Sequence, residues 1–398
     1  MFYLKTFTDF EPIILAPSGI AAMNIGGSTI HRFFGIVSTS PGQGDEGAVV
    51  NLFGVDCNLH VLRAAGKPPF FILDEVSMLS ASMFKILLTA LGELANSTDV
   101  FGGYPLVAMG DFGQLGPIVK REEGAGWLHT EWLWTSNNIM FSFHIHHLTV
   151  SCRQGPEEQR FFRFLEIVRR GPLTESEQTF VEKIFHERFL HQDDMVDASV
   201  TGITVLSSRL DGVRIINNAM TNKLSAPDER VKYDAVDSVS IPMDVESWKA
   251  GLERETGLST HLVLWVGARV IVTANLDVAG GVSNGAMGTI CECQQDQVRV
   301  QLASSDVWIG RETRETSHGG VARSQLPLLL AYALTMHRAQ GLTLNRVMVD
   351  LGDLFCPGQG YVAMSRVKRL EDLFIVRLPQ NLNDLFPPKQ VQPLLQRF

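Results

Sequence analysis

Acidic and amide side chains follow two apolar stretches of the sequence, at the points where those stretches end. Asp74 and Glu75 come directly after one apolar run, and Asp111 and Gln114 come shortly after another. Such runs are typical of buried parallel strands, whose carboxyl ends meet at one edge of a sheet, where ligands bind. We therefore expect these four side chains to share one site.

The pairing of an aspartate with a glutamate suits the hydrolysis of a nucleoside triphosphate. One carboxylate can hold Mg²⁺ while the next accepts a proton from the attacking water. Asp111 and Gln114 could then sense the γ-phosphate. A plainer explanation is that Asp74 caps the helix that follows it, because aspartate is favoured at helix starts. The rest of the sequence must decide between the two.

The composition is that of a folded globular protein. The chain has 398 residues, of which 45% are hydrophobic and 19% charged, and its net charge is -9. That charge argues against a simple basic nucleic-acid-binding module but allows a motor with a locally basic channel. No apolar run is long enough to span a bilayer, and the first residues lack a secretory signal, so we expect an intracellular protein.

The cysteines and histidines do not indicate a metal centre. The five cysteines are odd in number and scattered, so they predict neither a disulfide framework nor a four-ligand zinc site. His144 and His146 could form a metal pair on one strand face, yet no third ligand stands at a recognised spacing. We favour a half-exposed edge strand over Phe141–Leu148. The arginines of the amphipathic segment Glu157–Arg170 are interpreted as a solvated face.

The order of the expected elements predicts an α/β fold with a β-rich insertion. From about Val231 the pattern changes to short alternating segments with turn residues, which is typical of a small β-barrel. The α/β pattern returns at Leu326. Residues 37–67 are rich in Gly, Ser and Pro and indicate an inserted loop or small subdomain. Short buried strands are expected at residues 11–15, 70–73, 106–109, 203–206, 347–351 and 374–376.

Six short motifs follow one another along nearly the whole chain, at residues 16–31, 74–78, 110–115, 152–154, 337–343 and 361–366. In this order they resemble motif Ia with its extension and motifs II, III, IV, V and VI of superfamily 1 helicases of the Pif1 type, including the helicase part of Helitron-like elements. Each motif alone could arise by chance, but six in sequence could not.

The resemblance implies an enzyme that uses ATP and Mg²⁺. Asp74 would coordinate Mg²⁺, and Glu75 would orient and deprotonate the attacking water. Gln114 would report the γ-phosphate to the strand channel. Arg153 and Arg366 would be arginine fingers from the second motor domain, because a guanidinium fork suits phosphoryl charge. An arginine without this motif context would be assigned to a surface ion pair.

The resemblance also implies a groove for single-stranded DNA beside the nucleotide cleft. Asp111 and Gln340 would lie on the nucleotide side, and Gln340 would couple the cleft to DNA. The groove would use backbone amides, hydroxyls and flat rings on which bases stack without sequence preference. For Phe33 a place in the core is as consistent with the sequence as stacking. The implied strand-binding residues are Pro17, Ser18, His31, Phe33, Thr335, His337 and Tyr361.

The implied architecture is two RecA-like motor domains, each a parallel sheet flanked by helices. The second would carry an inserted small SH3-like β-barrel that closes over the strand. The expected boundaries are residues 1–150 for the first domain, with the insertion 37–67, residues 151–234 and 324–378 for the second, 235–323 for the SH3-like subdomain and 379–398 for a C-terminal tail.

The family's phosphate-binding loop, Gly-x-x-x-x-Gly-Lys-Ser/Thr, has no counterpart among these residues. Only ten residues precede Glu11, and the one Gly-Lys pair, Gly66–Lys67, is followed by two prolines that donate no amides. We expect that the sequence is truncated before this loop and that the chain as written hydrolyses ATP poorly. Motif III also departs from the family at Gly113 and Gly116, where a larger residue and a proline are usual.

Two functions therefore remain open. The first is a 5′-to-3′ ATP-dependent DNA helicase, for which the resemblance implies roles in DNA repair, recombination or telomere maintenance. The second is a non-catalytic nucleic-acid-binding remnant of a helicase. The expected partners are single-stranded DNA and duplex/single-strand junctions, with no membrane. We expect a nuclear location first and a mitochondrial one second.

Overall fold

The computed structural model covers most of the chain, and only its described residues are discussed below. These residues are 10–17, 21–22, 25–34, 36–38, 48–49, 68–117, 143–191, 202–239, 251–253, 256–277, 282, 284–303, 305–315, 321–387, 389 and 391–395. Ser18 and most of the insertion 37–67 lie outside them. Within that insertion the structure describes a two-stranded antiparallel pair, β3 (Val37–Ser38) and β4 (Ala48–Val49).

The first sheet has four strands, all parallel, in the order β2-β1-β5-β6. Its core packs aromatic rings edge to face, with the ring centroids of Phe71 and Phe101 5.3 Å apart. The carboxyl ends of β5 and β6 deliver the acid and amide side chains to one edge. The bounds are β1 (Glu11–Ala16), β2 (Ser28–Thr29), β5 (Pro69–Leu73) and β6 (Leu106–Ala108).

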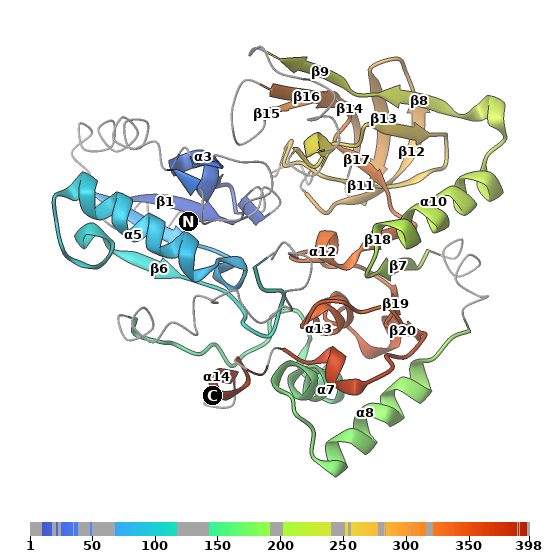
Figure 1. Cartoon of the computed structure of the whole chain (residues 1–398). Coiled ribbons are helices and arrows are strands. Elements are labelled where there is room, and N and C mark those ends of the chain that lie inside the picture. Colours follow the sequence, from blue (N-terminus) through green and yellow to red (C-terminus); the bar gives the residue numbers. More distant parts are fainter. Residues whose placement is uncertain are drawn as a thin grey trace, which may run out of the picture.

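One long helix and several short ones accompany this sheet (Figure 1). The long helix, α5 (Ala81–Ala95), begins at Ser80, whose hydroxyl accepts a hydrogen bond from the Met83 amide at 3.1 Å. Such a cap satisfies one of the free amides of a helix start. The shorter elements are α3 (Ile30–Phe34) and the 3-10 helices η2 (Val76–Met78) and η3 (Val100–Gly103).

The second sheet is also fully parallel, in the order β18-β7-β19-β20. Its strands are apolar and buried on both faces, as expected for a parallel sheet covered by helices. The bounds are β7 (Thr204–Ser207), β18 (Ala333–Thr335), β19 (Val347–Asp350) and β20 (Leu373–Val376). The two parallel sheets confirm the predicted α/β fold.

Helices of the second unit come from both ends of its sequence. Most begin or end with residues that satisfy the free backbone groups, such as Thr174 in a capping box with Glu177 at the start of α8. The bounds are η6 (Pro156–Glu158), α7 (Gln159–Arg170), α8 (Glu175–Arg188), α10 (Leu210–Leu224), η8 (Pro227–Glu229), α12 (Met336–Ala339), α13 (Gln359–Met364), η9 (Leu370–Asp372) and η10 (Leu382–Leu385).

Between α10 and β18 the chain forms antiparallel strands, drawn at the upper right of Figure 1. A five-stranded sheet runs in the order β14-β13-β12-β11-β17, a three-stranded one in the order β15-β16-β9, and β8 pairs with β10. The bounds are β8 (Val231–Asp234), β9 (Val236–Val239), β10 (His261–Leu264), β11 (Arg269–Val272), β12 (Met287–Cys293), β13 (Gln297–Leu302), β14 (Asp306–Gly310), β15 (Glu312–Glu315), β16 (Val321–Gln325) and β17 (Leu328–Leu330). The SH3-like character and the domain boundaries stay predictions.

The structure differs from the sequence analysis in the expected edge strand around His144 and His146. Residues 143–150 form no strand, and His144, His146 and Leu148 are exposed, because no described strand lies alongside to pair with them. No group of three or more His, Cys, Asp or Glu side chains in the described ranges is placed to hold a metal ion.

The last described helix, α14 (Gln392–Leu395), returns to the first unit. Val391 and Leu395 are buried in the same hydrophobic cluster as Phe71 and Phe84. Residues from both ends of the chain therefore build one core. Among the helices that the structure describes, none has the length and apolar character needed to cross a bilayer.

Candidate active site

Glu75 is held rigidly at the carboxyl edge of the first sheet. The amide of Asp74 donates to the Leu15 carbonyl at 2.9 Å, and the amide of Val76 donates to the Met109 carbonyl at 2.9 Å. Between these two bonds Glu75 takes the left-handed conformation, with φ 49° and ψ 41°. This conformation costs a non-glycine residue roughly 1–3 kcal/mol and is concentrated at functional sites. The backbone therefore aims the Glu75 side chain away from the sheet.

The Glu75 carboxylate points to the second unit. The Gln340 side-chain amide, at the end of α12, donates to Glu75 Oε2 at 3.2 Å. Burial raises the pKa of Glu75, and the nearby Asp74 charge raises it further, whereas the Gln340 hydrogen bond and Arg366 oppose this rise. A carboxylate that is partly desolvated in this way is a better proton acceptor than one in water.

The two predicted arginine fingers lie together on the opposite side of the cleft. Arg153 donates to the Thr343 hydroxyl at 3.2 Å and to the Ser365 carbonyl at 3.1 Å. Arg366 is 1% exposed, and burial lowers its pKa to about 10, with the like charge of Arg153 as the next cause. The charges of Glu75 and Arg366 act on one another's pKa, and the Glu75 charge also raises the pKa of Arg153 against the effect of burial. Both guanidinium groups therefore lie within electrostatic reach of Glu75.

Asp111 and Gln114 lie in the loop after β6, where they make a connected network. Asp111 accepts hydrogen bonds from Gln114 Nε2 at 3.3 Å, from Arg169 Nε at 2.8 Å and from the Tyr361 hydroxyl at 3.0 Å. Asp111 is therefore fully occupied by protein donors, whereas it was predicted to bind the nucleotide. Gln114, in the same loop, keeps a buried side-chain oxygen without a partner among the described residues.

The cleft has polar atoms that the described residues leave without a partner. The Oε1 atom of Gln114 and the hydroxyl of Ser77 are both buried and accept or donate no hydrogen bond within the described part of the chain. Within the described part of the chain the Asp74 carboxylate makes no ion pair or side-chain hydrogen bond, and Asp74 is half-buried. Magnesium ions in such sites take one or two carboxylates and complete their shell with phosphate and water. The residues present fit a nucleotide with Mg²⁺.

The predicted strand-binding residues are spread over three places. Pro17 follows β1, and His31 and Phe33 are half-buried on α3, where Phe33 packs edge-on against Phe34 and Phe71. The core position is therefore the one that Phe33 takes. On the second unit, Thr335 caps α12 by accepting from the Arg338 amide at 3.3 Å.

The other two predicted strand-binding residues, His337 and Tyr361, are both held by contacts within the protein. The His337 ring stacks on Phe355 with centroids 5.9 Å apart, and burial lowers the pKa of His337. Tyr361 was predicted to contact the strand, but its ring is 9% exposed and its hydroxyl donates to Asp111. The structure thus moves Tyr361 from the strand groove to the contact between the two units, because α13 packs under the motif III loop.

The sequence analysis missed Arg169, which belongs to this network. It was grouped with the solvated arginines of α7, and two of its neighbours do behave so: Arg160 pairs with Glu187, and Arg170 pairs with Glu177. Arg169 differs because it directly follows the buried Val168, at the border of the apolar face. Two features of the sequence could have indicated this role: the position of Arg169 beside the apolar face of α7, and the unusual glycine at residue 113.

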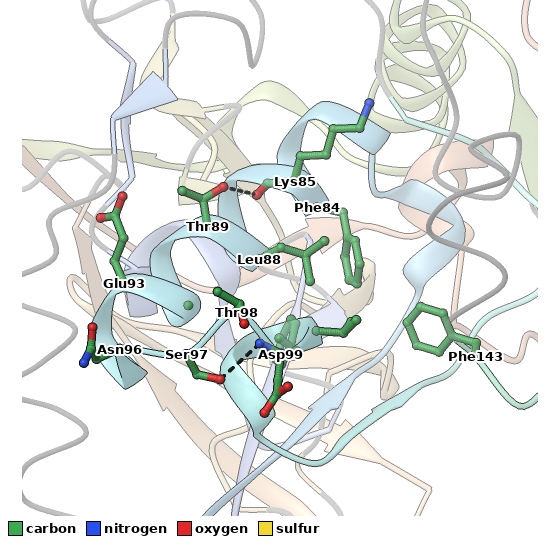
Figure 2. A pocket seen from close by; sticks show the side chains of 13 residues that line it. Phe84, Lys85, Leu88, Thr89, Glu93, Asn96, Ser97, Thr98, Asp99 and Phe143 are labelled. Carbon is green, nitrogen blue, oxygen red and sulfur yellow. Dashed lines mark hydrogen bonds between the residues drawn. The ribbon is translucent and has the colours of Figure 1, made fainter.

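A cavity of about 680 Å³ lies elsewhere, between α5 and η3 (Figure 2). Phe84 and Phe143 face one another across it, with ring centroids 6.0 Å apart and Lys85, Glu93 and Asp99 around it. None of the predicted site residues lines this cavity. The predicted site residues therefore lie outside this cavity.

Two parallel sheets that share a cleft lined by carboxylates, amides and arginines are the arrangement of nucleotide-driven motors built from paired RecA-like domains. A family model described as PIF1-like helicase matches residues 7–179. The chain is 32% identical over 369 residues to ATP-dependent DNA helicase PIF1 of Danio rerio, an alignment that covers 91% of this chain and 53% of that protein. These matches support a Pif1-like helicase of superfamily 1 as the family of this chain.

Solved structures agree with this assignment. Bacteroides sp Pif1 in complex with ADP-AlF4 matches with a TM-score of 0.71 and 25% identity, over 100% of this chain and 89% of that one. Bacteroides Pif1 bound to ssDNA matches with a TM-score of 0.67 and 26% identity, over 99% and 89% of the two chains. The chain spans about half the length of the curated relatives it matches.

Proposed function

We propose that this chain is the motor part of an ATP-dependent DNA helicase of the Pif1 type. The observation that carries the proposal is the contact of Glu75 with Gln340 across the cleft, with Arg366 acting on the same carboxylate. This arrangement brings a base from one sheet and cations from the other to one point. The names of the relatives and the nucleotide and DNA in the titles of the solved structures support it.

In the proposed mechanism each side chain has one task. Bound Mg²⁺ would neutralise phosphate charge, and Asp74 is the residue that would hold it. Glu75 accepts a proton from the attacking water, and Gln114 orients that water. Arg153 and Arg366 stabilise the charge that develops on the transferred phosphoryl group. The two arginines act only when the cleft is closed, since they belong to the second unit.

The proposed strand surface lies along the motif Ia and motif V segments. Pro17, Ser18, His31, Thr335 and His337 supply amides, hydroxyls and rings to a single strand of DNA without base preference. We propose movement in the 5′-to-3′ direction, on single strands and on duplex/single-strand junctions. The antiparallel strands between α10 and β18 would close over the strand as an SH3-like module.

The proposal extends to the cellular role and location of the protein. We propose work in DNA repair, recombination or telomere maintenance, with the nucleus as the first location and the mitochondrion as the second. The 398 residues contain no Gly-x-x-x-x-Gly-Lys-Ser/Thr motif. The chain as written is therefore expected to turn over ATP slowly, because no lysine and amide nest grips the phosphates.

The test is the Glu75→Gln variant, assayed for phosphate release with and without an oligothymidine, in the chain as written and in a form extended upstream to a phosphate loop. We expect the extended form to turn over ATP in a DNA-stimulated manner. Glu75→Gln should lower that turnover by about a hundredfold or more, since it removes the base, while oligothymidine binding stays within about twofold.

Glu93→Gln is the matched control, because Glu93 is an exposed glutamate on α5 away from the cleft. It should leave turnover unchanged. If Glu75→Gln behaved like Glu93→Gln, Glu75 would not be the base and the proposed chemistry would be wrong. Oligothymidine binding without any turnover in the extended form would favour the non-catalytic remnant instead.

A further inference from the structure

Asp111 receives hydrogen bonds from both units of the molecule. From its own loop, the Gly113 amide donates to Oδ1 at 3.0 Å and Gln114 Nε2 donates to Oδ2 at 3.3 Å. From the second unit, Arg169 Nε donates to Oδ1 at 2.8 Å and the Tyr361 hydroxyl donates to Oδ2 at 3.0 Å. One carboxylate therefore joins the motif III loop to both α7 and α13.

The Arg169–Asp111 pair is well shielded from water. The two side chains are 16% and 21% exposed. Burial is the largest single influence and would lower the pKa of Arg169, but the charge and hydrogen bond of Asp111 together with Tyr361 and Glu166 raise that pKa overall. Charge-assisted hydrogen bonds in such surroundings are about twice as strong as neutral ones. The pair is thus a strong link between the units and not a solvent-exposed surface ion pair.

The glycine at residue 113 lets the two partners approach. A Cβ atom built on Gly113 would lie 2.5 Å from Cγ of Arg169, which real side chains do not allow. The Arg169 stem therefore lies directly over the Gly113 backbone. In this chain the small residue in motif III and the inward-facing arginine of α7 depend on each other.

The network also decides how the Gln114 amide is turned. Its nitrogen donates to Asp111, so its oxygen points away from Asp111, and that oxygen is buried and has no partner among the described residues. An amide oxygen can only accept a hydrogen bond, and a phosphate oxygen cannot donate one. The group that satisfies Gln114 Oε1 must be a donor such as a water molecule.

We propose that Arg169, together with Tyr361, is a positioning residue that turns the Gln114 oxygen toward the attacking water through Asp111 when the two units close. The inference rests on the function proposed above. It adds a second route of coupling to that through Gln340: the first orients the base and the second orients the water. Opening the cleft breaks the Arg169–Asp111 bond, releases the Gln114 amide and stops hydrolysis.

The test measures DNA-stimulated phosphate release of the wild type and of Arg169→Ala, Arg169→Lys and Tyr361→Phe. All four proteins are assayed in the form extended upstream to a phosphate loop, for which ATP turnover is expected. Arg169→Ala should lower kcat about tenfold, the effect of losing one charged hydrogen bond. The KM for ATP and the Kd for an oligothymidine should change less than about twofold, since neither ligand is touched. Arg169→Lys should recover part of the rate, and Tyr361→Phe should lower kcat severalfold.

Arg170→Ala is the control, because Arg170 is the next residue of α7 and pairs with Glu177 on the outer side. It should leave kcat unchanged. The double variant Arg169→Ala/Asp111→Ala should be no slower than Asp111→Ala alone, since both residues act through one bond. Circular dichroism of each variant checks that it is folded, and Tyr361→Phe keeps the test open if Arg169→Ala does not fold.

The possible results distinguish a failure of the proposed function from a failure of the role inferred for Arg169. A wild type with no DNA-stimulated turnover would overturn the proposed function and with it this inference. Turnover in the wild type with equal kcat values for Arg169→Ala and Arg170→Ala would overturn the inference alone. A tenfold rise in KM for ATP without a loss of kcat would assign Arg169 to nucleotide binding and would also overturn it.

Discussion

Among the described residues two arginines are fully buried, and their surroundings differ. Arg323 on β16 makes a bidentate ion pair with Asp237, in which Nε donates to Oδ1 at 2.7 Å and Nη2 donates to Oδ2 at 2.8 Å. Arg366 instead donates to the Val362 and Leu342 carbonyls and the Ser365 hydroxyl, and no carboxylate of the described residues forms an ion pair with it. This difference is consistent with the role proposed for Arg366, since its positive charge is not neutralised by an ion pair within the described residues.

The Arg323 pair gives a prediction about stability. Asp237→Asn leaves a buried cation without its anion, so we expect the free energy of unfolding to fall by about 3 kcal/mol. Urea denaturation followed by circular dichroism measures the loss. Asp306→Asn is the control, because the Arg299–Asp306 pair is 39% and 46% exposed and such pairs contribute about 1 kcal/mol or less. Equal losses for the two variants would contradict the assigned role of burial.

At the scale of elements, the start of α13 lies against the motif III loop. Gly358 caps this helix with φ +81°, and a Cβ atom there would lie 2.7 Å from the Gln114 carbonyl oxygen and 3.0 Å from that of Gly113. Both neighbours are backbone atoms, which cannot turn aside as a side chain could. The contact therefore sets the distance between the loop and the helix.

We predict that Gly358→Ala slows ATP turnover by about tenfold or more, because a shift of ~1 Å in a catalytic group can cost on the order of a hundredfold. Oligothymidine binding should persist. Gly267→Ala is the control: Gly267 has φ +92° and open space around its Cβ position, so it shares the backbone strain without the collision. Phosphate release distinguishes them, and equal rates in the two variants would show that the collision has no consequence.

The same scale shows what could be predicted from the sequence. The strands ending near Leu73 and Ser207 were predictable because each is a short run that is buried on both faces. The strand ending at Ala108 was predictable from its apolar residues, although Val107 is exposed. The apolar run Leu328–Thr335 forms two strands, β17 and β18, in different sheets. An unbroken apolar run carries no sign of which sheet each half will join.

The site was predictable where residue type and motif spacing coincide, and not where partners come from distant segments. Glu75 and Gln340 belong to recognisable motifs, and the structure joins them. The bond between Asp111 and Arg169 spans residues with no shared motif, and charge pattern alone puts Arg169 in solvent. Tyr361 was misplaced for the same reason, since its partner is set by how the two sheets meet.

At the scale of the whole molecule, a net charge of -9 must be reconciled with DNA binding. The proposed strand surface relies on local contacts, and each phosphate contact releases a counterion. With about three such contacts, we predict that oligothymidine affinity falls roughly twentyfold over a fourfold rise in salt. Fluorescence anisotropy at several salt concentrations measures the slope. An affinity independent of salt would mean that phosphates are not contacted.

The placement of Val391 and Leu395 in the core of the first unit has a consequence for how the molecule is made on the ribosome. The strands β1 and β5 and helix α5 emerge early, but the apolar patch that Val391 and Leu395 cover stays exposed until these two residues have left the ribosome. The first unit therefore completes its core only after the second unit has been synthesised.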